Sequence, residues 1–197
     1  MKVTNILIIL NVIMFILTLI FKEKIIYLLG FSPLRFFERP WTIFTNLFVH
    51  GSDLHLFVNM LTLFIFGNPL EKIIGKKKFL MLYILSGISG NILYYIFYFN
   101  QDIIGIGASG SIFGILGAFA ILRPHDYVVI FPFMVPIPMT VALIIWILLN
   151  VFGFLLQVGN IGYIAHLGGL FVGIILGKKF KRKKEFFIEE YLNSFEF

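Results

Sequence analysis

The stretch GIGASGSIFGILGAFAIL, residues 105–122, sets one serine between glycines at the start of an apolar run. Ser109 precedes the next charged residue, Arg123, by 14 positions, which corresponds to about 21 Å of α-helix. The hydrocarbon core of a bilayer is about 30 Å thick. If this run is a membrane helix with Arg123 at one surface, the serine lies several ångströms below the other surface.

The composition points to a membrane protein. Of the 197 residues, 59% are hydrophobic and 13% are charged, whereas a water-soluble domain carries about 25% charged residues. Cysteine is absent, which excludes disulfides, thiolate catalysis and cysteine-based metal sites.

Six apolar stretches have lengths near those that cross a bilayer as helices. They cover residues 4–21, 54–70, 79–99, 109–122, 137–157 and 164–180. The first lacks a small-residue cleavage site, which favours an uncleaved helix over a signal peptide. The sequence therefore predicts an all-α membrane protein. A six-helix transmembrane bundle occupies residues 1–180, and a tail that is first basic and then acidic occupies residues 181–197.

Lysine and arginine are distributed unequally between the two ends of the predicted bundle. With six spans and both termini on one side, that side holds 12 of the 16 basic residues. They are Lys2, Lys72, Lys76, Lys77, Lys78, Arg123 and the six in the tail segment KKFKRKK. The positive-inside rule makes this side cytoplasmic. We therefore attribute the net charge of +6 to the orientation of the protein in the membrane and to attraction to anionic lipid, and not to nucleic-acid binding. Without a eukaryotic targeting segment, we expect a prokaryotic plasma membrane.

The connection between the first two predicted helices, residues 22–53, is too polar to cross the membrane and is rich in aromatic residues. We expect a structured loop on the outer side, partly embedded in the membrane.

Polar side chains inside a membrane are costly and usually mark function. The second predicted helix opens with His55 and Asn59, which lie four residues apart on one face. The fourth opens with Ser109 and the sixth with His166. These three helices run in the same direction under the predicted topology, so the four side chains lie at a similar depth. We therefore expect one shared site below the outer surface.

These residue types suit hydrolysis by a serine nucleophile. A histidine titrates near neutral pH, so His166 can take the proton of Ser109 and return it to a leaving amine. The resulting oxyanion needs donors. The His55 ring, the Asn59 amide and the unpaired backbone N–H of Ser109 can supply them. Ser111 is a competing nucleophile, but it lies about 200° around the helix from Ser109.

Other residues near these motifs have several interpretations. Gly107 and Gly110 leave space for a substrate backbone beside the hydroxyl. Asp53 or Asp102, both on the outer side, would complete a triad. His50 precedes the second helix and is expected at the interface. His50, Asp53 and His55 approach a metal-ligand spacing, but no further ligand accompanies them, so we expect neither a metal nor another cofactor.

Three motifs together resemble the rhomboid intramembrane serine proteases: HLFVN at 55–59, GASG at 107–110 and AHLGGLFVG at 165–173. The resemblance runs from about Trp41 to Gly177 and implies the minimal six-helix core of that family, with the loop between the first two helices embedded in the membrane. It implies a dyad of Ser109 and His166, with His55 and Asn59 in the oxyanion hole.

Two further positions take their interpretation from this resemblance. Glu71 is similar to a family carboxylate with a structural role at the inner end of the second helix. Some members carry a tyrosine four residues after the nucleophile, where this chain has Phe113. A phenylalanine can stack on the histidine but donates no hydrogen bond.

We therefore expect an intramembrane serine endopeptidase that cuts transmembrane segments of other membrane proteins near the extracytoplasmic face. Its substrates need a locally weak helix, because a stable helix hides its carbonyls in hydrogen bonds. A movable lid is expected from the segment FPFMVPIPM, residues 131–139, and the fifth helix with Trp146, or from the loop after that helix. The alternatives are an inactive relative that binds transmembrane segments without cutting them, and a transporter. A transporter would show repeats or paired broken helices, which this sequence lacks.

Overall fold

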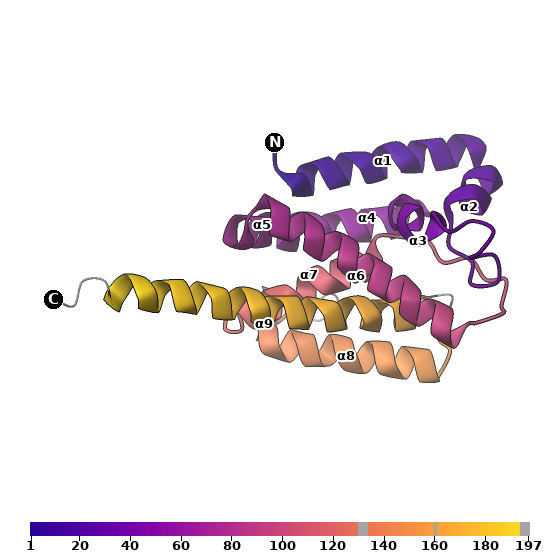
Figure 1. Cartoon of the computed structure of the whole chain (residues 1–197). Helices are drawn as coiled ribbons and strands as arrows, with labels where there is room; N and C mark the ends of the chain where they lie inside the picture. The colour runs from indigo at the N-terminus through magenta and orange to yellow at the C-terminus, as the bar shows by residue number, and fades with distance from the viewer. Residues whose placement is uncertain (130–133, 160, 194–197) are drawn as a thin grey trace.

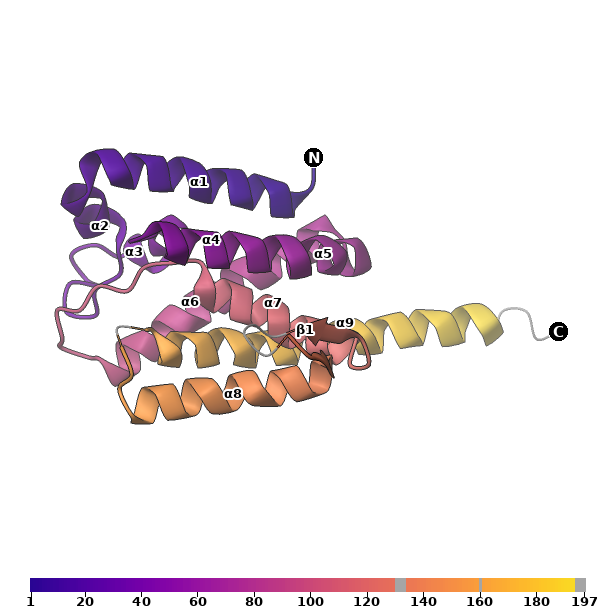
Figure 2. The ribbon, with the colours of Figure 1, turned by 180° about the vertical axis from the view of Figure 1, so that it is seen from behind.

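The computed structural model describes residues 1–129, 134–159 and 161–193, with side chains described as far as Arg182. Helices dominate this part of the chain. The long helices lie side by side and alternate in direction along the sequence (Figure 1, and from behind in Figure 2). The two chain termini lie toward the same end of the bundle.

The first helical segment is α1 (Val3–Phe21). The next long segment has three parts: α4 (Asp53–Thr62), one π-helical turn (Leu63–Gly67) and α5 (Asn68–Ile74). It ends at Gly75, whose φ of +82° suits glycine. The stretch predicted at 54–70 therefore extends as far as Ile74.

Glu71 joins these two segments. Its carboxylate accepts hydrogen bonds from the backbone N–H groups of Val3 and Thr4, at 2.9 and 2.8 Å, and from the Thr4 hydroxyl at 2.7 Å. The first N–H groups of a helix have no partner within the helix, so this buried carboxylate caps α1 from a neighbouring helix.

The remaining long helices are α6 (Lys76–Phe97), α7 (Ser109–Leu122), α8 (Met139–Leu155) and α9 (Tyr163–Asn193). By length and composition, four helical segments in the described chain can cross a membrane: Val3–Phe21, Asp53–Ile74, Lys76–Phe97 and Tyr163–Arg182. The helices α7 and α8 are apolar but shorter. The predicted boundary between core and tail at residue 180 falls inside α9.

The helix α7 lies at the centre of the bundle, between α4 on one side and α8 and α9 on the other (Figure 2). Glycines bring it close to α9. A Cβ on Gly169 would collide with the Gly110 carbonyl, and one on Gly173 with the Gly114 carbonyl. Small residues permit such close backbone approach between membrane helices. This packing sets the serine that begins α7 beside the first turn of α9.

The connection at residues 22–53 contains three short helical elements. They are α2 (Glu23–Leu29), α3 (Thr42–Thr45) and a 3-10 turn (Asn46–Phe48). An isolated bridge between Phe31 and Gly105 ties this connection to the segment that leads into α7. Asp102 strengthens the tie, because its carboxylate accepts hydrogen bonds from Arg35 and from Ser32.

Between α7 and α8, strand β1 (Tyr127–Val129) pairs antiparallel with β2 (Pro136–Pro138). The proposed lid segment begins in this region. Its first part, residues 131–133, lies outside the described residues.

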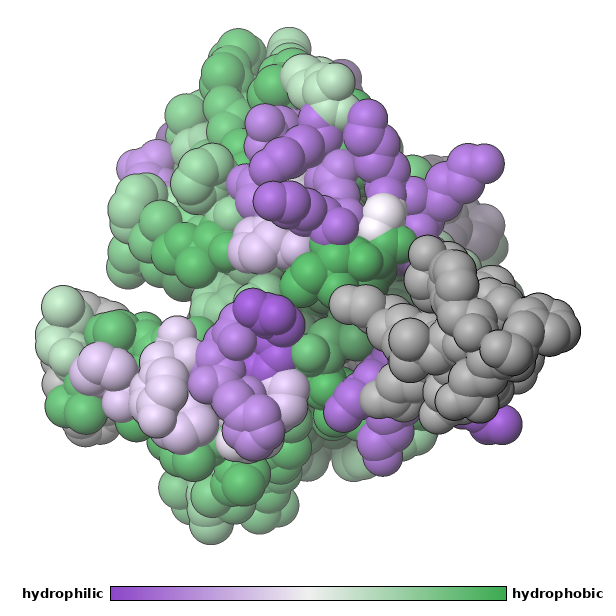
Figure 3. All heavy atoms as spheres, turned by 90° about the vertical axis from the view of Figure 1, so that its left-hand side faces the viewer, coloured by the Kyte–Doolittle hydropathy of each residue, from purple (hydrophilic) through white to green (hydrophobic). Residues whose placement is uncertain are grey.

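The surface of the bundle is suited to lipid. Large apolar side chains are more than half exposed on its flanks, among them Leu19, Phe57, Leu149 and Phe171. Figure 3 views the end where the termini lie and shows hydrophilic residues gathered there, with hydrophobic residues around them. The helix α6 begins at this end (Figure 1), and its first three residues are Lys76, Lys77 and Lys78. The structure is thus that of a helical membrane protein.

Candidate active site

Ser109 is the first residue of α7, and the backbone before it is held from two sides. The Gly107 N–H donates to the Asn46 carbonyl at 2.9 Å. The Ala108 N–H points at Nε2 of His50, at 3.5 Å. Gly107 has a φ of +117°, a conformation that residues with a Cβ rarely adopt. This turn delivers the serine hydroxyl to the interior of the bundle.

His166 lies in the first turn of α9, and its Nε2 is 2.8 Å from the hydroxyl oxygen of Ser109. Phe113, one turn into α7, stacks on the imidazole, with the ring centres 4.4 Å apart and the planes 11° from parallel. Tyr163 meets the same imidazole edge-on, with centres 6.4 Å apart. Two helices therefore bring a hydroxyl and an imidazole into hydrogen-bond contact, and aromatic rings restrict the imidazole.

Asn150, on α8, completes the surroundings of the imidazole. Its Oδ1 is 2.8 Å from Nδ1 of His166, and the residue is 4% exposed. The sequence analysis missed this residue. A signal in the sequence could have identified it, because Asn150 is an amide inside an apolar predicted membrane helix, as Asn59 is. Polar groups at such positions are costly.

The two expected oxyanion-hole residues lie in α4. The His55 ring stands against Gly107, where a Cβ would be 2.6 Å from His55 Nε2. The buried Asn59 amide donates to the His55 carbonyl at 2.7 Å. Within the described residues, neither side chain hydrogen-bonds to Ser109, whose hydroxyl is engaged by His166.

His50 corrects an expectation from the sequence. It was expected at the membrane interface, but it is fully buried and packs against His55 with ring centres 4.9 Å apart. Burial away from water, with a smaller contribution from His55, lowers the pKa of His50 to about 3. A neutral imidazole supports the backbone before Ser109 as a hydrogen-bond acceptor.

The rival residues lie elsewhere. Ser111 is fully buried, and its hydroxyl lies against Gly87 of α6. The carboxylate of Asp102 is paired with Arg35, whose hydrogen bond holds the pKa of Asp102 below its usual value. Neither Asp53 nor Asp102 hydrogen-bonds to His166 in the described chain. Among the side chains that the structure describes, in residues 1–129, 134–159 and 161–182, no group of three or more histidines, cysteines or acidic residues could hold a metal.

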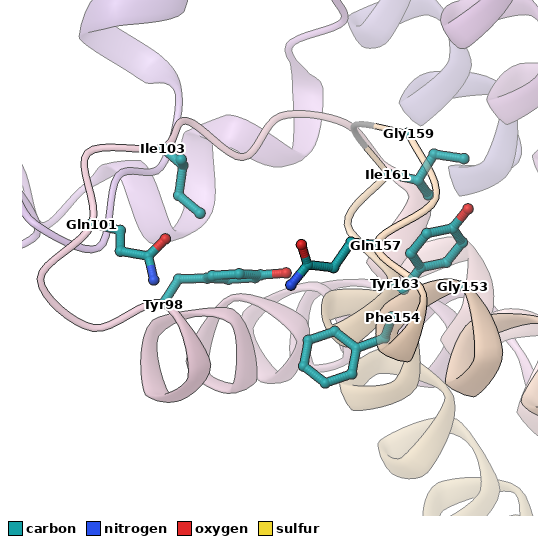
Figure 4. Close-up of a pocket in the computed structure, with 9 residues that line it drawn as sticks. All are labelled: Tyr98, Gln101, Ile103, Gly153, Phe154, Gln157, Gly159, Ile161 and Tyr163. Atoms are coloured by element: carbon teal, nitrogen blue, oxygen red, sulfur yellow. The ribbon is translucent and has the colours of Figure 1, made fainter.

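A cavity of about 310 Å³ lies between the end of α6 and the end of α8. It is lined by Tyr98, Gln101, Ile103, Gly153, Phe154, Gln157, Gly159, Ile161 and Tyr163. Figure 4 shows the Tyr98 hydroxyl and the Gln157 amide pointing toward each other across it. Neither Ser109 nor His166 lines this cavity. Tyr163 touches both the cavity and the imidazole, so its ring lies between them.

Residues 38–183 match the family model described as Rhomboid domain. Rhomboid protein 1, mitochondrial, of Saccharomyces cerevisiae is 38% identical over 140 residues, which are 69% of this chain and 40% of that protein. Putative rhomboid protease YdcA of Bacillus subtilis is 34% identical over 147 residues, 74% of this chain and 69% of that protein. Rhomboid protease GluP, also of Bacillus subtilis, is 35% identical over 133 residues, 68% of this chain and 24% of that protein. The chain thus spans less than half the length of two of these three relatives.

Proposed function

Because this chain belongs to the rhomboid family, we propose that it is an intramembrane serine endopeptidase with Ser109 as nucleophile and His166 as general base. The observation that carries the proposal is the 2.8 Å contact between Nε2 of His166 and the Ser109 hydroxyl. A nucleophile and a base within hydrogen-bond reach are what covalent catalysis by serine requires. The names of two relatives include rhomboid protease.

In the proposed reaction, the Ser109 hydroxyl attacks a peptide carbonyl of the substrate while its proton passes to Nε2 of His166. The bond to the amine breaks as His166 returns this proton to the leaving nitrogen. Water then attacks the acyl-serine, with the same histidine as base, and releases the carboxylic acid. Each tetrahedral intermediate carries an oxyanion. The His55 ring, the Asn59 amide and the backbone N–H of Ser109 are the donors that we assign to it.

We assign six membrane spans: the four long helical segments together with α7 and α8. The end with both termini and most lysines is the cytoplasmic side by the positive-inside rule. His55, Ser109 and His166 each lie in the first turn of a helix. These first turns are at the end of the bundle away from the two termini (Figure 2). The site then opens toward the extracytoplasmic side of a prokaryotic plasma membrane, with the connection at residues 22–53 partly embedded beside it.

The proposed substrates are membrane proteins whose transmembrane helix is weakened near the cut. They reach the serine when α8 moves away from the segment formed by α4, the π-turn and α5. Trp146 of α8 meets Phe66 of that segment edge-on, with ring centres 6.2 Å apart. An edge-on aromatic pair contributes only about 0.5–1.5 kcal/mol beyond the area it buries, so in this proposal the pair separates when α8 moves as part of the lid.

The test is cleavage of a model single-pass substrate in proteoliposomes, with the product ends mapped by mass spectrometry. We expect the wild type to cut near the outer end of the substrate helix, S109A to be inactive and S111A to keep its activity. Binding of the substrate without cleavage would instead indicate an inactive relative that only binds transmembrane segments. Cleavage by S109A would refute the assigned nucleophile.

A further inference from the structure

We propose that Asn150 is a positioning residue that holds His166 in the tautomer able to accept the serine proton. This inference rests on the proposed function, because it deepens the role of the same site. It adds a third residue, from a third helix, to the pair formed by Ser109 and His166. The residue is an uncharged amide, and it acts through the histidine rather than on the substrate.

The orientation of the Asn150 amide follows from its second partner. Its Nδ2 lies 2.8 Å from the backbone carbonyl of Trp146, one turn earlier in α8. A carbonyl oxygen only accepts hydrogen bonds, so the NH₂ group must face it. The amide oxygen therefore faces Nδ1 of His166.

That oxygen determines which imidazole nitrogen carries the proton. An amide oxygen is only an acceptor, so Nδ1 must donate to it at 2.8 Å. In a neutral imidazole the other nitrogen is then unprotonated. That nitrogen is Nε2, the atom in contact with the Ser109 hydroxyl. In serine enzymes of other folds, an acidic third residue fixes the same tautomer, and an asparagine orients the histidine in papain-like cysteine enzymes.

The other groups around the imidazole do not accept a hydrogen bond from Nδ1 of His166. Phe113 covers one face and offers no acceptor in the ring plane. The Tyr163 hydroxyl donates to the Val158 carbonyl at 3.0 Å. His55 is the nearby ionisable group in α4, and its ring stands against Gly107. Among the described residues, the Asn150 oxygen is thus the acceptor that Nδ1 contacts.

The position of Asn150 also links the histidine to the lid. The residue lies in α8, and it is anchored by its bond to Trp146, the residue that meets Phe66 across the proposed opening. When α8 lies as in this structure, the oxygen reaches Nδ1. When α8 moves outward, the imidazole loses this acceptor and Nε2 can become protonated. The activation of Ser109 therefore depends on α8 being in the position that it has in this structure.

The experiment compares N150L, which removes the acceptor in a side chain of similar size, with N150D. In either protonation state the carboxyl group of N150D can keep an oxygen toward Nδ1 of His166, so N150D retains the acceptor; only the neutral form can also donate to the Trp146 carbonyl. The matched control is N11L in α1. Asn11 is buried and donates to the carbonyl four residues earlier, Leu7, at 2.7 Å, as Asn150 does to Trp146. N11L therefore tests the loss of a similar amide bond on a helix that carries no active-site residue.

Two readouts are needed for each variant: ¹⁵N NMR of labelled histidine and the kinetics of substrate cleavage. The chain has four histidines, so the His166 signals are identified by their absence in H166A. We expect the wild type, N150D and N11L to carry the proton on Nδ1. We expect N150L to shift the proton toward Nε2 and to lower kcat about tenfold or more, with a smaller change in KM.

The outcomes separate this inference from the proposed function. If N150L keeps the Nδ1 proton and the wild-type kcat, Asn150 does not position the histidine, while the protease assignment stands. Equal losses in N150L and N150D would also overturn the inference, because N150D retains the acceptor. If the wild type cuts no substrate, the proposed function fails, and the NMR comparison still decides whether Asn150 sets the tautomer.

Discussion

The two glycines beside the serine provide a sharp test, because they look alike in the sequence and differ in the structure. Gly107 has a φ of +117°, and a Cβ there would lie 2.6 Å from Nε2 and 2.7 Å from Cε1 of His55. At Gly110, a Cβ would lie 3.5 Å from the Ala165 carbonyl, an ordinary contact, and the backbone is helical. G107A should therefore damage the site, whereas G110A should fold normally.

The expected magnitudes follow from these contacts. Holding alanine in the backbone conformation of Gly107 costs on the order of 1–3 kcal/mol. Carbon atoms prefer separations of about 3.5–4.0 Å, so the His55 ring must move by roughly 1 Å to accept the methyl group. If His55 serves the oxyanion, losing it lowers kcat by about 100-fold or more. G110A gains up to about 1 kcal/mol in helix propensity, and any effect of a blocked substrate path should appear in KM.

The assay is unfolding in detergent by a graded denaturant, together with kcat and KM for a transmembrane substrate, for the wild type and both variants. The activity of G107A is normalised to the folded fraction, so that instability is not counted as lost catalysis. If the two variants are equally stable and equally active, the reasoning from backbone conformation and from the His55 contact is refuted.

Three further predictions concern other parts of the molecule. E71A removes the acceptor for three donors at the start of α1 and should lower the free energy of unfolding by roughly 2–4 kcal/mol. E71Q, which keeps one acceptor oxygen, should lower it less, and equal effects of the two would contradict the capping role. W146A removes the contact with Phe66 and should change the rate of cleavage more than the stability. A matching loss of both would count against α8 as a lid. D102N breaks the pair with Arg35, whose hydrogen bond lowers the pKa of Asp102. A lowered carboxyl pKa stabilises the fold above the unfolded-state pKa, and this contribution is lost as pH falls through the folded-state value. The stability difference between wild type and D102N should therefore be present at neutral pH and vanish in acid, and a difference that persists in acid would contradict the pairing.

Much of the architecture could be predicted from the sequence, because the bilayer imposes a simple rule on composition. Helices that span a membrane need long apolar runs, and each predicted run coincides with a helical segment. Residue counting also indicated that Ser109 and His166 begin helices that run in the same direction, and their side chains are in contact. These features depend on the local pattern of apolar residues and on the order of the helices along the chain.

The contacts between helices could not be predicted in this way. The pairing of Asn150 with His166 depends on how α8 is rotated against α9, which its nearly uniform apolar sequence does not reveal. The burial of His50 depends on how the connection at 22–53 folds over the segment before α7. The different constraints on Gly107 and Gly110 follow from a backbone angle and from the position of a ring on another helix. These contacts join different elements of the fold, so the local sequence pattern does not indicate them.

The central claim is that His166 activates the Ser109 hydroxyl, and the reaction of the intact protein with a fluorophosphonate tests it most directly. The wild type, S109A, S111A and H166A are labelled in detergent micelles, and the modified residue is located by peptide mass mapping. The account predicts one label per wild-type chain, on Ser109, together with unchanged labelling of S111A, none of S109A and strongly slowed labelling of H166A. Labelling of S109A, or labelling of H166A at the wild-type rate, would contradict it.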